Sequence, residues 1–314
     1  MILSNTSTPT VWTRDDLVEQ AQIALEEFAD RRLAEPGGLY ITHIKTHQKA
    51  IMRLFKALSC VDPDSPDPAI VRKVLLDETL FDALRYVSGP PMSEDDLGVL
   101  VTRNLAGITK TQIKRSDDLP VQILKLVCRL ADPYRFPWIA PRRAPSTREL
   151  REAIQATMTL HATQSLQTER RGYGKAVERR LETRLTELGF TKAPKPKRGK
   201  ITVPIQYPSY PNFYGECTVH GRKVDLFMAL PTGRMVALEA KDSSSALNSV
   251  KRLNNDTAAK AKHFAVEGGR NIINVALLSG VFKIESLESA QNSGLYLVWA
   301  HAMDGFINWI KSQT

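Results

Sequence analysis

The chain has 314 residues, of which 42% are hydrophobic and 25% charged, a composition that excludes a fibre or a disordered chain and allows one large core or two domains. The 43 Lys and Arg residues exceed the 34 Asp and Glu, so the formal charge of +9 favours a polyanionic partner such as nucleic acid. No stretch is apolar enough to span a membrane, and three widely spaced cysteines suit a reducing compartment, so we expect a cytoplasmic protein.

Helical patterns dominate the first half of the chain. The stretch TRDDLVEQAQIALEEFADRRL opens with a Thr-x-x-Asp capping signal at Thr13 and then spaces apolar residues three and four apart. Proline-rich breaks divide this half into helical hairpins, at residues 62–68, 88–96 and 131–150. We expect a helical domain over residues 1–168 that serves DNA binding, dimerisation or both.

Two histidines in this half, His43 and His47, stand one helical turn apart. This is the spacing of two metal ligands on one helix. Metalloprotease chemistry would also require a Glu directly after His43, and the chain has Ile there. We therefore interpret both histidines as ordinary helix residues.

A helix and a basic connection separate the two halves. In AVERRLETRLTELGF, an apolar stripe that includes Val177, Leu181 and Leu185 stops at Gly189, a residue typical of the C′ position. The next segment, TKAPKPKRGK at residues 191–200, is interrupted by proline and carries basic residues without any acid. This composition predicts an extended, solvated connection.

Strands alternate with helices after the connection. Patterns of period two predict strands near residues 223–230, 234–241, 271–278 and 294–300, with helices near residues 246–266 and 303–312. This alternation is typical of α/β layers. We predict an α/β (α+β) fold, in which the helical domain precedes a second domain over residues 169–314.

The stretch DLFMALPTGRMVALEAK predicts a β-hairpin that gathers charged residues. Pro-Thr-Gly fits a three-residue loop with a positive φ angle at Gly233. If the residues that flank this loop pair with each other, Asp225 lies opposite Glu239. Lys241, two residues further along the strand, shares their face. Two carboxylates and an ammonium group would then meet at the open end of the hairpin.

This arrangement suits the hydrolysis of a phosphodiester. Asp225 and Glu239 offer the hard oxygen ligands that Mg²⁺ prefers, and the Ala240 carbonyl can add a backbone ligand. The metal would polarise the phosphate, while Lys241 positions or helps deprotonate the attacking water. The alternative is a hairpin with ordinary surface charges. The apolar neighbours of Glu239 favour the site, because an acid in an interior strand rarely lacks a partner or a metal.

The order of these elements resembles the PD-(D/E)xK nuclease superfamily: a helix, a strand with Asp225, a strand with Glu239 and Lys241, and a crossover helix. Val224 stands where the superfamily name has proline. More narrowly, the segments GECTVHGRKVDLFMALPTGRMVALEAKDSSSALNSVKRLNNDTAAKA and NVALLSGVFKIESLESAQNSGLYLVWAHAMDG look like the XamI family of type II restriction endonucleases. The similarity is strongest over residues 170–312.

The resemblance implies a mixed-sheet α/β/α nuclease core and Mg²⁺-dependent double-strand cleavage of DNA at a short palindrome, with Mn²⁺ able to replace Mg²⁺. A GTCGAC-like target and 5′-phosphate and 3′-hydroxyl ends are expected, although family membership does not transmit a target. Cutting a palindrome calls for a homodimer, and the genetic partner would be a DNA methyltransferase. A helix Glu completes the site in many superfamily members. Glu178 is our candidate, with Glu182 and Glu216 as alternatives.

The segment DSSSALNSVKRLNNDTAAKAKHF, directly after the Lys241 strand, predicts a helix that reads DNA. Its polar side chains can pair with base edges or contact phosphates. The basic connection is expected to add phosphate contacts. The expected DNA-binding residues are Ser244, Asn248, Lys251, Arg252, Asn255, Lys197 and Arg198.

Two other functions fit the same residues. One is a DNA repair or junction nuclease on the same core, and the other is a non-catalytic DNA-binding protein that retains the fold. The intact set of Asp225, Glu239 and Lys241 argues against the second. Only substrate tests separate the first from a restriction enzyme.

Overall fold

The computed structural model divides the chain into two compact units. Ala34–Arg170 form the helical unit, and Met1–Leu33 together with Arg171–Thr314 form the sheet unit. None of the helices in the described part of the chain is long and apolar enough to cross a membrane. The structure describes residues 7–58, 61–62, 64–104, 107–245, 253, 263–264, 266 and 271–313.

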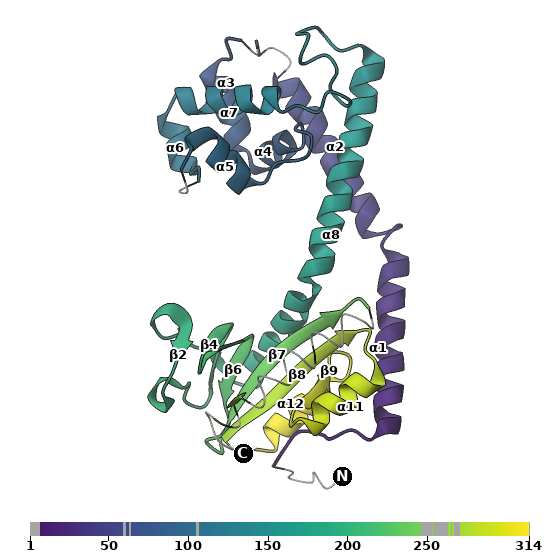
Figure 1. Ribbon diagram of the computed structural model, residues 1–314, viewed down its shortest axis with the longest axis vertical. Helices are drawn as coiled ribbons and strands as arrows, with labels where there is room; N and C mark the ends of the chain where they lie inside the picture. The colour runs from purple at the N-terminus through teal and green to yellow at the C-terminus, as the bar shows by residue number, and fades with distance from the viewer. Residues whose placement is uncertain are drawn as a thin grey trace. The chain divides into compact units, whose positions relative to one another are not determined.

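The helical unit contains two long helices and several short ones, and three of its breaks follow the proline-rich segments as expected (Figure 1). Asp67 caps the helix that begins at Pro68, since its side chain accepts a hydrogen bond from the Ala69 amide. Ser93 closes a capping box at the next proline-rich break. The helices of this unit are α2 (Leu39–Leu58), α3 (Pro68–Leu76), α4 (Glu78–Arg85), α5 (Glu94–Thr102), α6 (Lys110–Arg115), α7 (Asp118–Arg129) and the first part of α8 (Thr147–Glu187).

The sheet unit contains a mixed six-stranded sheet in the order β1-β3-β6-β7-β8-β9 and a small sheet in the order β2-β4-β5. Strand β6 runs antiparallel to β3 and β7, whereas β7, β8 and β9 are parallel. The fold is therefore α+β, as expected. Besides the end of α8, its elements are α1 (Arg14–Ala34), β1 (Thr191–Lys192), η1 (Lys197–Gly199), β2 (Lys200–Ile201), η2 (Pro204–Gln206), β3 (Asn212–Tyr214), β4 (Cys217–Val219), β5 (Arg222–Val224), β6 (Leu226–Ala229), β7 (Met235–Ser243), β8 (Ile272–Gly280), α11 (Ile284–Asn292), β9 (Tyr296–Trp299) and α12 (Met303–Lys311).

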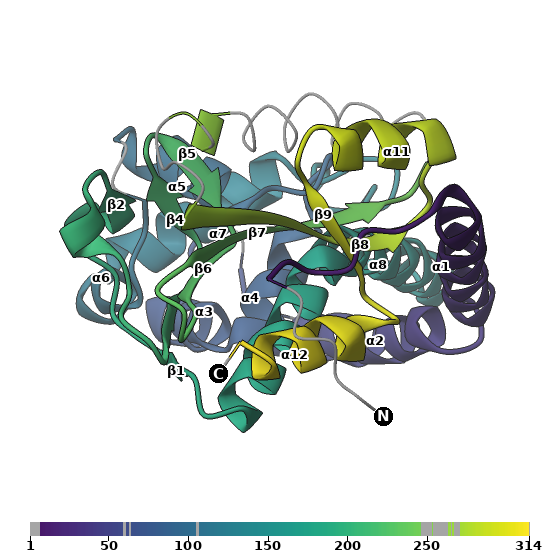
Figure 2. The same cartoon turned by 90° about the horizontal axis from the view of Figure 1, so that it is seen from below.

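Helices cover both faces of the six-stranded sheet, with α11 on one side and α12 on the other (Figure 2). The end of α8 packs beside α12, and its predicted stripe of Val177, Leu181 and Leu185 is buried against β6, β7 and β8. The small sheet packs on the opposite face, where Phe227 of β6 and Ala237 of β7 are buried. The alternating strands of the sequence thus bury both of their faces.

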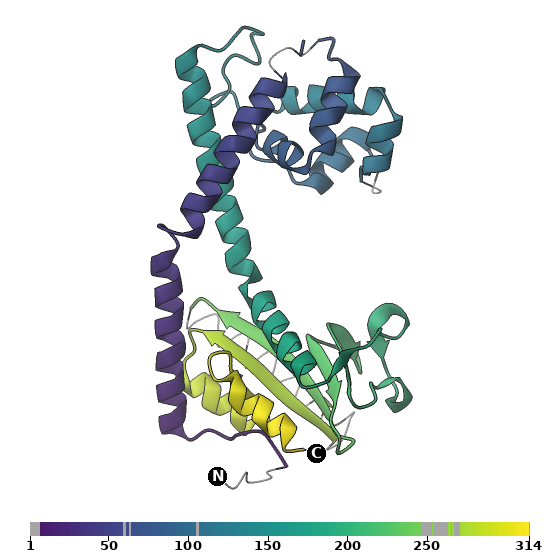
Figure 3. The same ribbon diagram turned by 180° about the vertical axis from the view of Figure 1, so that it is seen from behind.

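Helix α1 belongs to the sheet unit, so the expected domain over residues 1–168 does not coincide with a compact unit. Its Thr13 cap forms as predicted, because the Asp16 amide donates to Thr13 Oγ1 at 3.2 Å. Leu17 and Ala21 are then buried against β8, β9 and α11, beside Trp299. Figure 3 shows α1 running along this edge of the unit. Periodicity predicted the helix but could not tell which core its apolar face joins.

Most predicted strands are present, with two differences. The strand expected near residues 223–230 is divided into β5 and β6, which enter different sheets. The basic connection is exposed as expected, but strand pairing anchors it: β1 pairs with β3 and β2 with β4. Most of the helix expected near residues 246–266 lies outside the described residues.

Candidate active site

Strands β6 and β7 form the predicted hairpin in the predicted register. The Leu230 amide donates to the Arg234 carbonyl at 2.8 Å, and Gly233 has a φ angle of 79°. Leu226 pairs with Leu238 at the far end of the ladder. The ladder ends there, and the next residue, Asp225, is bonded to β7 at Leu238 and Ala240.

Asp225 occupies a bend between β5 and β6. Its backbone amide donates to the Leu238 carbonyl at 3.0 Å, and its Oδ2 accepts a hydrogen bond from the Ala240 amide at 2.9 Å. Val224 and Leu226, on either side of this bend, are buried in different hydrophobic clusters. The bend arises where the chain leaves the small sheet and enters the large one. It ends the ladder and directs the Asp225 carboxylate at β7.

Strand β7 carries the other residues of the motif. The side chains of Glu239 and Lys241 are only 12% and 14% exposed, and Lys241 Nζ pairs with Glu239 Oε1. Ala240 faces the other side of the sheet by strand alternation. Because the amide and carbonyl of a strand residue point to the same edge, the Ala240 carbonyl faces the side where Asp225 lies. Carboxylate and carbonyl oxygens are the donors that Mg²⁺ takes, so this set fits the ion.

Helix α8 adds a cluster around Lys175. Its Nζ donates to Glu178 Oε2 at 2.8 Å and to Glu216 Oε2 at 3.3 Å, and it lies 3.6 Å from Asp225 Oδ1. The candidates Glu178 and Glu216 are therefore brought to Asp225, whereas Glu182 pairs with the Lys192 ammonium at 2.7 Å. Lys175 was absent from the predicted site. Its position three residues before Glu178, on the same helix face, was the available signal.

Electrostatics at this cluster indicate an excess of negative charge. Burial raises the pKa of Glu178, and the carboxylates of Asp225 and Glu216 add to the effect, which the Lys175 ammonium only partly opposes. Partial burial lowers the pKa of Lys175, but the hydrogen bond to Glu178 and the charge of Asp225 outweigh it, so the pKa is raised. The raised pKa of Lys175 shows that the carboxylates around it favour a cation at this position.

Each hairpin carboxylate lies beside an ammonium group. Within the described ranges, the group of three His, Cys, Asp or Glu residues whose donor atoms all lie within 4.8 Å of one another is His47, Asp82 and His161, in the helical unit. At the hairpin, Lys175 lies beside Asp225, and Lys241 pairs with Glu239. A dication there would have to compete with both ammonium groups.

The expected DNA-binding residues are only partly described. Ser244 is exposed directly after β7, and Lys197 is exposed in η1. Arg198 also lies in η1, but its side chain is outside the description. The residues of the expected reading helix, Asn248, Lys251, Arg252 and Asn255, all lie outside the described residues.

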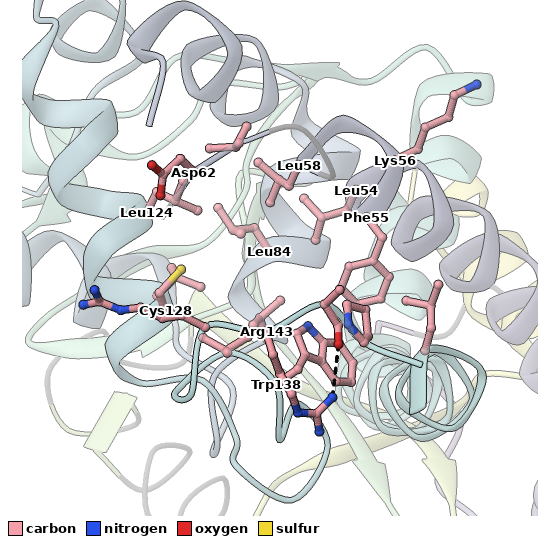
Figure 4. Close-up of a pocket in the computed structure, with 18 of the residues that line it drawn as sticks. Leu54, Phe55, Lys56, Leu58, Asp62, Leu84, Leu124, Cys128, Trp138 and Arg143 are labelled. Carbon is pink, nitrogen blue, oxygen red and sulfur yellow. Dashed lines mark hydrogen bonds between the residues drawn. The ribbon is translucent and has the colours of Figure 1, made fainter. Parts of the chain in front are cut away.

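A large cavity lies elsewhere, in the helical unit. It measures about 750 Å³ and is lined mainly by apolar side chains such as Leu84 and Trp138, with Arg143 among its polar residues (Figure 4). The recess beside Glu239 measures only about 10 Å³. A large apolar cavity is the usual first guess for a small-molecule site. It does not mark the site of a nuclease, because a phosphate on the outside of duplex DNA is approached from an open surface.

The comparisons with known proteins bear on this geometry. The model of the XamI restriction endonuclease family matches residues 68–299. The chain belongs to this family. It is also 35% identical over 266 residues to the type II restriction enzyme XamI of Xanthomonas campestris pv. amaranthicola, a match that covers 84% of this chain and 94% of the relative. No solved structure matches the chain significantly.

Membership makes the chain a restriction endonuclease, an enzyme that cuts DNA at specific sites. The family match begins in the helical unit and runs through the end of α8, the hairpin and β8 to β9. It therefore includes both the Lys175 cluster and the motif of Asp225, Glu239 and Lys241.

Proposed function

We propose that the β6–β7 hairpin and the end of α8 form a PD-(D/E)xK catalytic site that makes Mg²⁺-dependent double-strand cuts at a short palindrome. The main support is the hydrogen bond from the Ala240 amide to Asp225, which ties the first acid of the motif to the backbone between Glu239 and Lys241. Family membership supports the activity, and type II restriction endonucleases generally use a divalent metal.

Each residue has a distinct task in this proposal. Asp225, Glu239 and the Ala240 carbonyl would hold Mg²⁺ (or Mn²⁺), with Glu178 as a further acid. The bound ion would supply a Lewis acid that offsets charge on the phosphate. Lys241 donates hydrogen bonds toward the attacking water, and its pairing with Glu239 already fixes the ammonium group beside the acid. Hydrolysis would leave 5′-phosphate and 3′-hydroxyl ends.

The remaining parts of the proposal follow from the substrate. Double-stranded DNA at a two-fold symmetric target calls for two sites, hence a homodimer. The cell's own DNA needs protection from cleavage, so we expect a cognate DNA methyltransferase. We also expect the enzyme to be cytoplasmic, where its DNA substrate is. We assign phosphate contacts to Lys197, Arg198 and Ser244, and base or phosphate contacts to the polar residues of the segment after β7. Those are Asn248, Lys251, Arg252 and Asn255.

Plasmid cleavage tests this function. Purified protein incubated with Mg²⁺ and plasmid DNA is expected to give discrete fragments, whose ends define the target and show whether it is GTCGAC-like. A smear, or nicks that depend on DNA structure, would indicate a repair or junction nuclease. Binding without any cleavage, in Mg²⁺ or Mn²⁺, would indicate a non-catalytic DNA-binding protein.

Lys175 is expected to compete with the metal. Lys175→Met removes an ammonium group 3.6 Å from Asp225 Oδ1 and should tighten Mg²⁺ binding about two- to tenfold, an effect kept small by solvent screening. Calorimetric titration of the DNA-free protein measures it. Lys192→Met is the matched control, because Lys192 is equally exposed, at 54% against 51%, and also pairs with an α8 glutamate. Equal or weaker Mg²⁺ binding by Lys175→Met would contradict this role.

Glu178 is expected to make metal binding sensitive to acid. Its raised pKa means that it takes up a proton at a higher pH than an ordinary glutamate and then stops attracting a cation. As the pH is lowered, Mg²⁺ affinity should therefore begin to fall above the pH range in which an ordinary glutamate titrates. Glu178→Gln should weaken binding above that range and flatten the profile. Glu182→Gln should behave like the unmodified protein. A Glu178→Gln profile as steep as that of the unmodified protein would leave the helix acid unassigned.

A further inference from the structure

Three helices of the helical unit bring together two imidazoles and a carboxylate: His47 of α2, Asp82 of α4 and His161 of α8. One donor atom from each lies within 4.8 Å of the others. His161 Nε2 is 2.7 Å from Asp82 Oδ2, and the rings of His47 and His161 stack with centroids 3.4 Å apart. These residues are far from one another in the sequence, so only the tertiary fold assembles them.

The cluster is buried and incompletely satisfied. His161 is 2% exposed and His47 is 9% exposed. Tyr86 stacks on the other face of His161 at 3.6 Å, so the ring is enclosed on both sides. Within the part of the chain that the structure describes, His161 Nδ1 has no hydrogen-bond partner. The ring is therefore held through Nε2, the nitrogen that faces Asp82, and the unpartnered Nδ1 is a cost that the fold bears.

We propose that His47, Asp82 and His161 form a binding site for a transition-metal dication of the Zn²⁺ class. Two imidazoles and one carboxylate are a donor set that suits Zn²⁺, with remaining positions filled by water. Mg²⁺ prefers oxygen donors throughout, so this site differs in chemistry from the hairpin. Donors of a tetrahedral ion with bonds of about 2.0 Å lie about 3.3 Å apart. His161 Nε2 and Asp82 Oδ2, now 2.7 Å apart, would therefore have to separate slightly, and a donor that lies as far as 4.8 Å away would have to approach.

The surroundings support ligand roles for the rings. Ser165 Oγ lies 2.9 Å from His47 Nε2, and such outer hydrogen bonds orient the imidazoles of metal sites. Arg85 also pairs with Asp82, which keeps the carboxylate ionised. The ion would join α2, α4 and α8, as metals do in the cores of helical bundles.

Cobalt binding to the full-length, metal-stripped protein tests the site. Co²⁺ replaces Zn²⁺ and reports its coordination by visible absorption. We expect the protein to bind about one Co²⁺ per chain, with a visible absorption spectrum that indicates a low coordination number. Zn²⁺ should displace this Co²⁺, and excess Mg²⁺ should not. His161→Asn and His47→Gln should each lower Co²⁺ affinity at least tenfold. The matched control is His301→Asn, a partly buried histidine of the sheet unit that pairs with Gln20.

Two further variants make the outcome decisive. Asp225→Asn should leave Co²⁺ binding unchanged, which separates this site from the hairpin and keeps the result independent of the nuclease assignment. Asp82→Asn changes a side chain that is 39% exposed, so it tests the ligand set even if His161→Asn does not fold. Absence of Co²⁺ binding by the unmodified protein, or binding that survives in both Asp82→Asn and His47→Gln, would overturn the proposal.

Discussion

Replacing Asp225 by Asn or Glu239 by Gln is expected to lower the rate of Mg²⁺-dependent DNA cleavage by about 10³-fold or more, while the fold and DNA binding persist. Each substitution keeps the shape of the side chain but removes a negative charge that the proposed ion needs. Both side chains are also close to DNA phosphates in this proposal. Losing their charge relieves repulsion, so metal-free DNA binding should be equal or tighter.

Three measurements separate the possible results for these variants. Plasmid cleavage gives the rate, calorimetry gives Mg²⁺ affinity, and fluorescence anisotropy gives metal-free DNA binding. Glu187→Gln is the control, because Glu187 lies further along α8 and pairs with Arg184. A folded Glu239→Gln protein that cuts at the normal rate would contradict the assignment of the hairpin as the catalytic site and leave Asp225 and Lys241 as ordinary hairpin charges. A variant that has lost all three properties, namely cleavage, Mg²⁺ binding and DNA binding, would point to misfolding.

Gly280→Ala is expected to destabilise the sheet unit by more than about 3 kcal/mol. Gly280 ends β8 with a φ angle of 87°, and an added Cβ would lie 2.1 Å from the Ser243 carbonyl oxygen. That carbonyl belongs to the last residue of β7 and accepts the Val281 amide at 2.8 Å. Because the clashing oxygen belongs to the backbone and is fixed by this backbone hydrogen bond, a small side-chain movement cannot relieve the clash. Thermal unfolding of the metal-free protein measures the loss.

Gly294→Ala separates strain from crowding at this position. Gly294 has a φ angle of 86°, nearly that of Gly280, but an added Cβ would meet nothing within 4 Å. The control should therefore show only the backbone strain, about 1–2 kcal/mol. Equal losses for the two variants would mean that β7 and β8 can move apart at this end. Since β7 also carries Glu239 and Lys241, such movement would reach the proposed site.

Features set by local chemistry could be predicted from the sequence. The hairpin register follows from strand period and from a loop that needs a positive φ at Gly233, and both act between near neighbours. The cap at Thr13 and the stripe that includes Leu181 are local for the same reason. These signals were enough to bring Asp225 to the part of β7 that carries Glu239 and Lys241, the central feature of the proposed site.

Contacts between distant segments were decided only by the tertiary structure. Lys175 joins Glu216 across 41 positions, and His47 meets Ser165 across 118. No periodicity extends over such separations, because helix and strand patterns state which face is apolar and not which partner covers it. The sequence by itself therefore determined helix α1, the apolar stripe at the end of α8 and the hairpin with its motif. Packing decided that α1 joins the sheet unit, that α8 brings Lys175 to Asp225, and that His47 stacks on His161.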